Sequence, residues 1–261
     1  HELHRKQEAL REFRQALEML EDLDDPAAKA SALLGLAEVQ HDLGSTEDAL
    51  ASIKESIDLI EPLRALLPES DLRVSFLDLR YNNYELLMAL LMEREHPEDE
   101  IRAFEASERF RARSLLDDVT GSPAVTTLSL KKIQQQVLDQ DSVLLAYALG
   151  KRGSFLWMIT KDSIASHLLR SRDEIEKAVS EVREAILAEE NYSETRSAAA
   201  IGRLSRMLFP TSVGDLGKQR LLLTLDGALY LVPFPVLCDP ALPHATTRRA
   251  IRATPPRVIR R

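Results

Sequence analysis

The chain has 261 residues, of which 44% are hydrophobic, and it carries a formal net charge of −8 at neutral pH. This length and composition suit one or two globular domains with a buried core. The negative charge argues against a general surface for nucleic acid or for an anionic membrane, because phosphate binding needs clustered cationic side chains. We therefore expect neither nucleic acid nor a membrane as a partner.

Residues 1 to about 119 have helical periodicity, with many alanines, leucines and glutamates and few β-branched residues. The segment 30–62 meets the spacing of a tetratricopeptide (TPR) repeat at Leu33, Leu36, Ala37, Gly44, Ala49, Ile53 and Ser56. In this pattern Gly44 opens the turn between two helices, and Ala49 allows their close approach. The pattern predicts a pair of antiparallel helices.

Two further, less regular copies flank this helix pair. A preceding half-repeat is visible at Ala9, Phe13 and Ala16, and a later copy has drifted around Tyr84 and Leu87. In the later copy Glu95 stands where the turn glycine would be, and Pro97 with the acids that follow it predicts the start of the next helix. We count about two and a half repeats and predict that residues 1–120 form a TPR-like helical domain.

Stacked helix pairs of this kind curve and present a groove to a protein or peptide partner. If the segment 30–62 has standard register, the groove is lined by Leu34, Glu38 and His41. These three residues are the predicted partner-binding residues, although such positions are often merely exposed to solvent. No second ligand stands at a useful spacing from His41, so we expect no metal and no cofactor.

The chain changes character after Gly121-Ser122-Pro123. A short helix is predicted over 130–138, and then three strands over 143–149, 155–160 and 164–169. Ser171 and Glu174 form a capping-box pattern before a helix with apolar residues at Ile175, Val179, Val182 and Ile186. A second helix, capped by Ser193, is predicted to run through Ile201, Leu204 and Leu208 to Pro210.

The segment LLLTLDGALYLVPFPVL, residues 221–237, has an apolar run typical of a strand that is buried on both faces. Asp226-Gly227 predicts a turn with a positive φ at the glycine, and residues 228–232 predict a second extended piece that ends at Pro233. The prediction for 121–261 is an α/β sheet covered on at least one face, with Trp157, Tyr147 and Tyr230 in its core.

Three segments resemble a known family when they are taken in order. ERFRARSLLDD, DQDSVLLAYALGKRGSFLWMIT and RLLLTLDGALYLVPFPVL together resemble the opening of a CHAT domain, the caspase-like domain commonly found behind TPR repeats. The resemblance covers about residues 100–238. It implies a fold class of α-helical TPR-like repeats, 1–120, followed by part of an α/β caspase-like (CHAT) domain with a basic tail, 121–261.

The same resemblance bears on activity. The family includes cysteine endopeptidases, whose reactive histidine and cysteine belong to two motifs after the position of Leu237 in this chain, and neither motif appears here. We therefore assign no catalytic residue and expect this chain to be inactive, as the regulatory and partner-binding portion of such a peptidase. The alternative is a non-enzymatic TPR scaffold or protein-interaction module with a pseudo-peptidase domain.

The single cysteine, Cys238, is not a convincing nucleophile. His244 follows it, whereas the caspase-like order places the histidine first, and no helix N-terminus or strand end is predicted nearby to lower its pKa. A pairing with His167 has no better support, and a packed thiol is the plainer interpretation. One cysteine and no signal-like N-terminus together predict a cytoplasmic protein.

Overall fold

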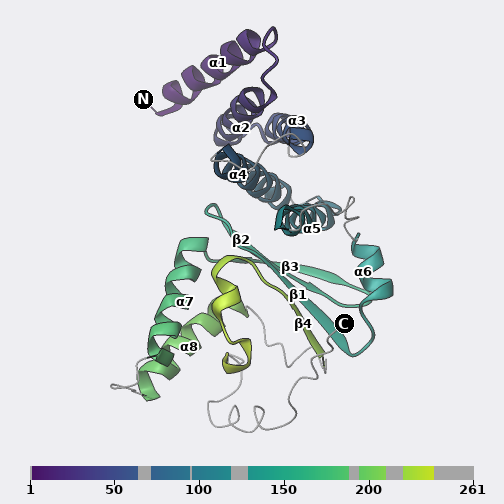
Figure 1. Cartoon of the computed structure of the whole chain (residues 1–261), viewed down its shortest axis with the longest axis vertical. Helices are drawn as coiled ribbons and strands as arrows, with labels where there is room; N and C mark the ends of the chain where they lie inside the picture. The colour runs from purple at the N-terminus through teal and green to yellow at the C-terminus, as the bar shows by residue number, and fades with distance from the viewer. Residues whose placement is uncertain are drawn as a thin grey trace. The chain divides into compact units, whose positions relative to one another are not determined.

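A computed structural model describes residues 2–63, 72–94, 96–118, 129–187, 194–209 and 220–237. Within these ranges the chain forms eight helices and a mixed four-stranded sheet, which agrees with a helical region followed by an α/β region (Figure 1). The chain divides into two compact units, His1–Leu130 and Lys131–Arg261.

The helical unit contains α1 (Glu2–Leu20), α2 (Pro26–Asp42), α3 (Thr46–Leu63), α4 (Leu72–Glu93) and α5 (Asp99–Asp118). Each helix contacts the next one along the chain, and α2 also contacts α4. Short connections make α2 with α3, and α4 with α5, into two antiparallel helix pairs. Helix α2 begins with an N-cap followed by proline, because the Asp25 carboxylate accepts a hydrogen bond of 2.9 Å from the Ala28 N–H and Pro26 is the first helical residue.

Small residues set the close packing of the first three helices. Ala37 on α2 and Ala49 on α3 are fully buried, and Gly44 between the helices has a φ of +80°, as the turn prediction requires. Gly35 makes room for α1: a Cβ atom there would lie 2.3 Å from Cζ of Phe13. The predicted half-repeat residues Ala9, Phe13 and Ala16 are all half-buried.

The α/β unit begins with most of α6 (Leu130–Gln136) and continues into the sheet, whose strand order is β3-β2-β1-β4. Strands β1 (Ser142–Ala148), β2 (Ser154–Ile159) and β3 (Ile164–Leu169) form the predicted antiparallel meander. Strand β4 (Arg220–Thr224) lies parallel to β1, with Leu145 opposite Leu223. Every residue of β1 and β2 is buried, as continuous apolar runs predict.

Helices α7 (Arg172–Leu187) and α8 (Glu194–Leu208) cover one face of this sheet (Figure 1). The predicted capping box starts α7, since Ser171 donates from its backbone N–H and from its hydroxyl to Glu174 Oε2. The shared core contains Ile175, Val179, Val182, Leu204 and Leu208. Ile186, which the helical pattern also predicts to face the core, is 43% exposed because it lies in the last turn of α7.

The segment after β4 differs from its prediction. Gly227 has the expected positive φ of +52°, but residues 228–232 are not extended: Gly227–Leu231 form a 3-10 helix, η3, and Phe234–Val236 form another, η4. Leu229, on η3, joins the core under α7. An apolar sequence of five residues suits a strand and a buried helical turn equally well.

Two predictions of burial in this segment are also wrong. β4 is not buried on both faces: Leu221 is 43% exposed, and the three residues after it are only half-buried. The strand also pairs with β1 alone among the described strands. Tyr230 is 66% exposed on η3, whereas Tyr147 and Trp157 are fully buried as predicted. The predicted cap Ser193, the Gly121-Ser122-Pro123 boundary, Glu95 and Pro210 lie outside the described residues.

Candidate functional site

The predicted partner-binding residues lie on one face of α2, spaced by four and three residues. His41 and Glu38 are half-buried, whereas Leu34 is only 9% exposed and has little surface to offer a ligand. Glu38 and His41 are thus the two predicted residues on the accessible part of this face. A role in binding stays a prediction for all three.

His41 joins two helices that are distant in the sequence. Its Nε2 atom lies 2.6 Å from Glu93 Oε2 at the end of α4, and the ring is largely shielded from solvent. This contact places the C-terminal turns of α2 and α4 side by side. The charged groups at this end therefore form a composite surface of two helices, which extends to Asp42 and its partner Lys6 on α1.

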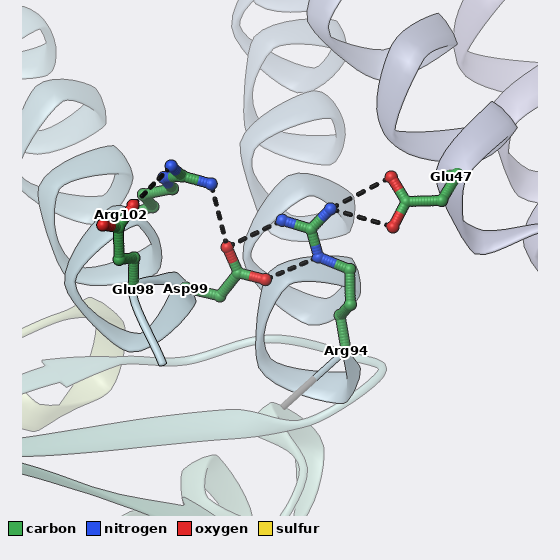
Figure 2. A network of polar contacts seen from close by, with 5 residues as sticks. All are labelled: Glu47, Arg94, Glu98, Asp99 and Arg102. Carbon is green, nitrogen blue, oxygen red and sulfur yellow. Dashed lines mark hydrogen bonds and ion pairs between the residues drawn. The ribbon is translucent and has the colours of Figure 1, made fainter. Parts of the chain in front are cut away.

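A network of five charged residues lies between α3, α4 and α5 (Figure 2). The Arg94 guanidinium binds both carboxylate oxygens of Asp99, at 2.6 and 2.8 Å, and both oxygens of Glu47, at 2.9 and 3.0 Å. Arg102 approaches Asp99 to 3.3 Å and Glu98 to 2.7 Å. Planar bidentate contacts of this kind fix orientation as well as distance.

Burial makes Asp99 the centre of this network. Its side chain is 1% exposed, whereas those of Glu47 and Glu98 are mostly in solvent. The hydrogen bonds from Arg94 lower the pKa of the Asp99 carboxyl despite its burial, and the same bonds, with those to Glu47, raise the pKa of Arg94. Asp99 is therefore a permanent anion at neutral pH and holds the start of α5 against the end of α4.

A second set of polar groups is enclosed between α3, α4 and α5. The Tyr84 hydroxyl donates a hydrogen bond of 2.7 Å to Glu61, and burial raises the pKa of this phenol. The fully buried Arg80 lies with its guanidinium carbon 5.2 Å from the centre of the Phe110 ring. The first contact joins α4 to α3, and the second joins α4 to α5.

The described residues show no catalytic constellation. Among them no three His, Cys, Asp or Glu side chains are arranged to hold a metal ion. Cys238 and His244 lie outside the described residues, and His167 is half-buried on β3. The helical unit instead presents ion pairs between its helices, at Lys6 with Asp42 and at Arg94 with Glu47.

Several residues that make structural contacts were not predicted from the sequence. Asp226 accepts a hydrogen bond of 2.7 Å from the Leu149 N–H, 77 residues away, and so ties the end of β4 to the end of β1. Arg220 pairs with Asp139 at the opposite ends of the same two strands. Arg94 and Asp99 are five residues apart across a turn, a spacing that signals no contact without the fold.

The chain was compared with known protein families, with curated proteins and with solved structures, and none of the three comparisons finds a match. No helix in the described part of the chain is both long and apolar enough to cross a membrane. A proposal of function therefore depends on the sequence and on the contacts of the described residues.

Proposed function

We propose that the helical unit is a TPR-like module that binds a protein or peptide, and that the α/β unit is part of a CHAT-like, caspase-like domain. In this proposal the chain is the regulatory and partner-binding portion of a cysteine endopeptidase of that kind, and it acts in the cytoplasm. It contributes recognition and no catalytic group of its own.

The observation that carries the proposal is the contact of α2 with α4. Consecutive antiparallel pairs, α2 with α3 and α4 with α5, stack so that the first helix of one pair lies against the first helix of the next. This is the arrangement by which helical repeats build a continuous binding face. Glu38, His41 and Glu93 give that face polar groups, and His41 Nε2 lies 2.6 Å from Glu93 Oε2.

The α/β unit supports the second half of the proposal. An antiparallel meander is followed by two helices and then by a strand parallel to the first, and the Asp226-Gly227 turn closes that strand. The resemblance to CHAT domains rests on three sequence segments taken in order. Two of these segments form β1 with β2 and the stretch from β4 to η4.

A peptide-display screen against the full chain tests the binding role. Peptides selected on the wild-type protein should bind His41→Ala and Glu38→Ala variants about three- to fivefold more weakly, as expected for partly exposed polar contacts. The matched control is Lys54→Ala, which alters an exposed residue of α3 away from this face. Equal affinity of all three variants for every selected peptide would contradict a binding role for the α2 face.

A separate experiment tests the absence of catalysis. The chain is incubated with a thiol-reactive activity probe and with a peptide library, and we expect no turnover. Labelling of Cys238 together with hydrolysis that a Cys238→Ala variant lacks would overturn this part of the proposal. Such a result would place a nucleophile inside the chain.

A further inference from the structure

A basic hollow lies in the α/β unit where β3 ends beside α8. Its volume is about 500 Å³, and it is lined by Leu168, Leu169, Arg170, Arg203, Arg206 and Met207. It belongs wholly to this unit and shares no residue with the charged surface of the helical unit. Half of its lining residues are arginines, so the hollow is a candidate site for an anionic group.

The three arginines are incompletely neutralised. Arg203 forms an ion pair of 2.7 Å with Glu181, and Arg170 lies 4.0 Å from Glu174. Arg206 is exposed and has no ion pair among the described residues. A carboxylate entering the hollow would therefore meet one guanidinium whose charge is uncompensated there and a second that is only weakly engaged.

The hollow lies beside the edge of the sheet. Leu168 and Leu169 are consecutive residues of β3, and consecutive side chains of a strand point to opposite faces of the sheet. A hollow lined by both residues, and by Arg170 directly after them, lies where β3 ends at the edge of the described sheet. β3 pairs with β2 alone among the described strands, so this edge can present backbone N–H and C=O groups.

Apolar surface adjoins the charge. Leu168 is 73% exposed, an unusual state for leucine in a strand, and Met207 is partly exposed on α8. A free phosphate ion would use the arginines but neither this apolar surface nor the strand edge. An extended peptide uses all three, since strand addition satisfies backbone groups while alternate side chains reach opposite faces.

We propose that the β3 edge and the adjoining hollow bind an extended acidic peptide segment of a partner protein. The peptide backbone lies along β3 as an added strand. A Glu or Asp side chain of the peptide binds Arg206 and Arg170, and the neighbouring apolar side chain, which points to the opposite face of the sheet, packs on Leu168. This site is independent of the binding role proposed for the helical unit.

Fluorescence anisotropy with the full chain and labelled hexapeptides tests this site. The probe is a peptide of alternating Glu and Leu, compared with the same peptide carrying Gln in place of Glu. We expect the Glu peptide to bind more tightly, and the Arg206→Gln variant to weaken it about three- to fivefold, as the loss of one exposed ion pair predicts. The matched control is Arg183→Gln, which removes an exposed charge of α7 outside the hollow.

Two further arms separate the peptide from a free anion and from general charge attraction. The peptide is N-methylated either at its odd or at its even residues. Only one of these two sets should weaken binding, because an added strand forms backbone hydrogen bonds through every second residue. Equal losses in Arg206→Gln and Arg183→Gln, or equal binding of the Gln peptide, would overturn the proposal. Binding of inorganic phosphate as tight as that of the peptide, with no effect of N-methylation, would assign the hollow to free anions and overturn it as well. Circular dichroism of both variants verifies that they are folded.

Discussion

The two helix pairs of the helical unit are closed in different ways. Between α2 and α3 the backbone closes the turn: Gly44 adopts a positive φ, and its N–H donates to the His41 carbonyl at 2.8 Å. Between α4 and α5 side chains do so, because Arg94 at the end of one helix binds Asp99 at the start of the next (Figure 2). The first closure needs one residue type, and the second needs two charged partners.

The helix–helix interfaces within the two pairs also differ in the kind of residue that forms them. α2 and α3 meet through Ala37 and Ala49, with the Ser56 hydroxyl donating to the Ala30 carbonyl at 2.7 Å. In the second pair the ring of Tyr84 on α4 lies 5.6 Å from that of Phe110 on α5. The two helix pairs thus share an antiparallel architecture although their interfaces contain different side chains. We expect the stability of the first pair to depend mainly on backbone geometry and that of the second pair mainly on electrostatics.

The largest effect is expected from Asp99→Ala. This change leaves Arg94 with the exposed Glu47 as its remaining carboxylate partner and removes the hydrogen bonds at the start of α5. We expect the free energy of unfolding to fall by about 2–3 kcal/mol, at or below the low end for a broken buried pair because Arg94 is itself partly exposed. Urea denaturation followed by far-UV circular dichroism measures this loss.

The matched control for Asp99→Ala is Glu98→Ala, which removes an exposed carboxylate of the same network. Its cost should stay below about 0.5 kcal/mol, the scale of surface helix pairs. Equal costs for the two variants would show that burial does not distinguish the two carboxylates, and that the α4–α5 joint does not depend on Asp99.

The contrast between the pairs also explains which features the sequence could predict. The α2–α3 pair is encoded locally, since Gly44, Asp25-Pro26 and the spacing of the small residues each have a single conformational meaning. The Arg94–Asp99 contact has no such signature. The acids after Pro97 suggest only a favourable helix start, and the pairing depends on where α4 ends in space.

In the α/β unit, too, local patterns predict some elements and not others. The buried strands β1 and β2 follow from continuous apolar runs, but the same kind of run at 221–225 gives a half-exposed edge strand, and 228–232 gives a 3-10 helix. Burial is a property of neighbours that a short segment does not contain. The hollow at Arg206 could likewise not be predicted, because its arginines come from α8 and from the residue that follows β3, and they meet only in the fold.

The next largest effect is expected from Gly44→Ala, which tests the closure by backbone. No atom lies within 4 Å of a Cβ built at Gly44, so its cost comes from the left-handed conformation alone. We expect a loss of about 1–2 kcal/mol in the free energy of unfolding. Gly202→Ala on α8 is the control, because a helical φ and ordinary contact with the Arg206 side chain should make it neutral or stabilising.

A pH series separates the two closures further. Since hydrogen bonds from Arg94 lower the folded-state pKa of Asp99, its contribution is complete above the unfolded-state pKa of about 4 and is lost as the pH falls through the lower folded value. The difference in stability between the wild type and Asp99→Asn should be constant from about pH 7 to pH 5 and shrink below about pH 4. The difference between the wild type and Gly44→Ala should show no such trend, because no titrating group is involved.

The smallest effect concerns the polar contact inside the first pair. Ser52 on α3 donates a hydrogen bond of 2.8 Å to Gln40 Oε1 on α2, and both side chains are buried. Ser52→Ala leaves the Gln40 carbonyl without this donor and should cost about 0.5–1 kcal/mol, whereas the double variant Ser52→Ala with Gln40→Leu should recover most of the loss, since no polar group is left unsatisfied. A double-mutant cycle from urea denaturation measures the coupling. A double variant less stable than Ser52→Ala alone would mean that the Gln40 amide has a further role at this interface, and that the first pair, like the second, depends on specific polar partners.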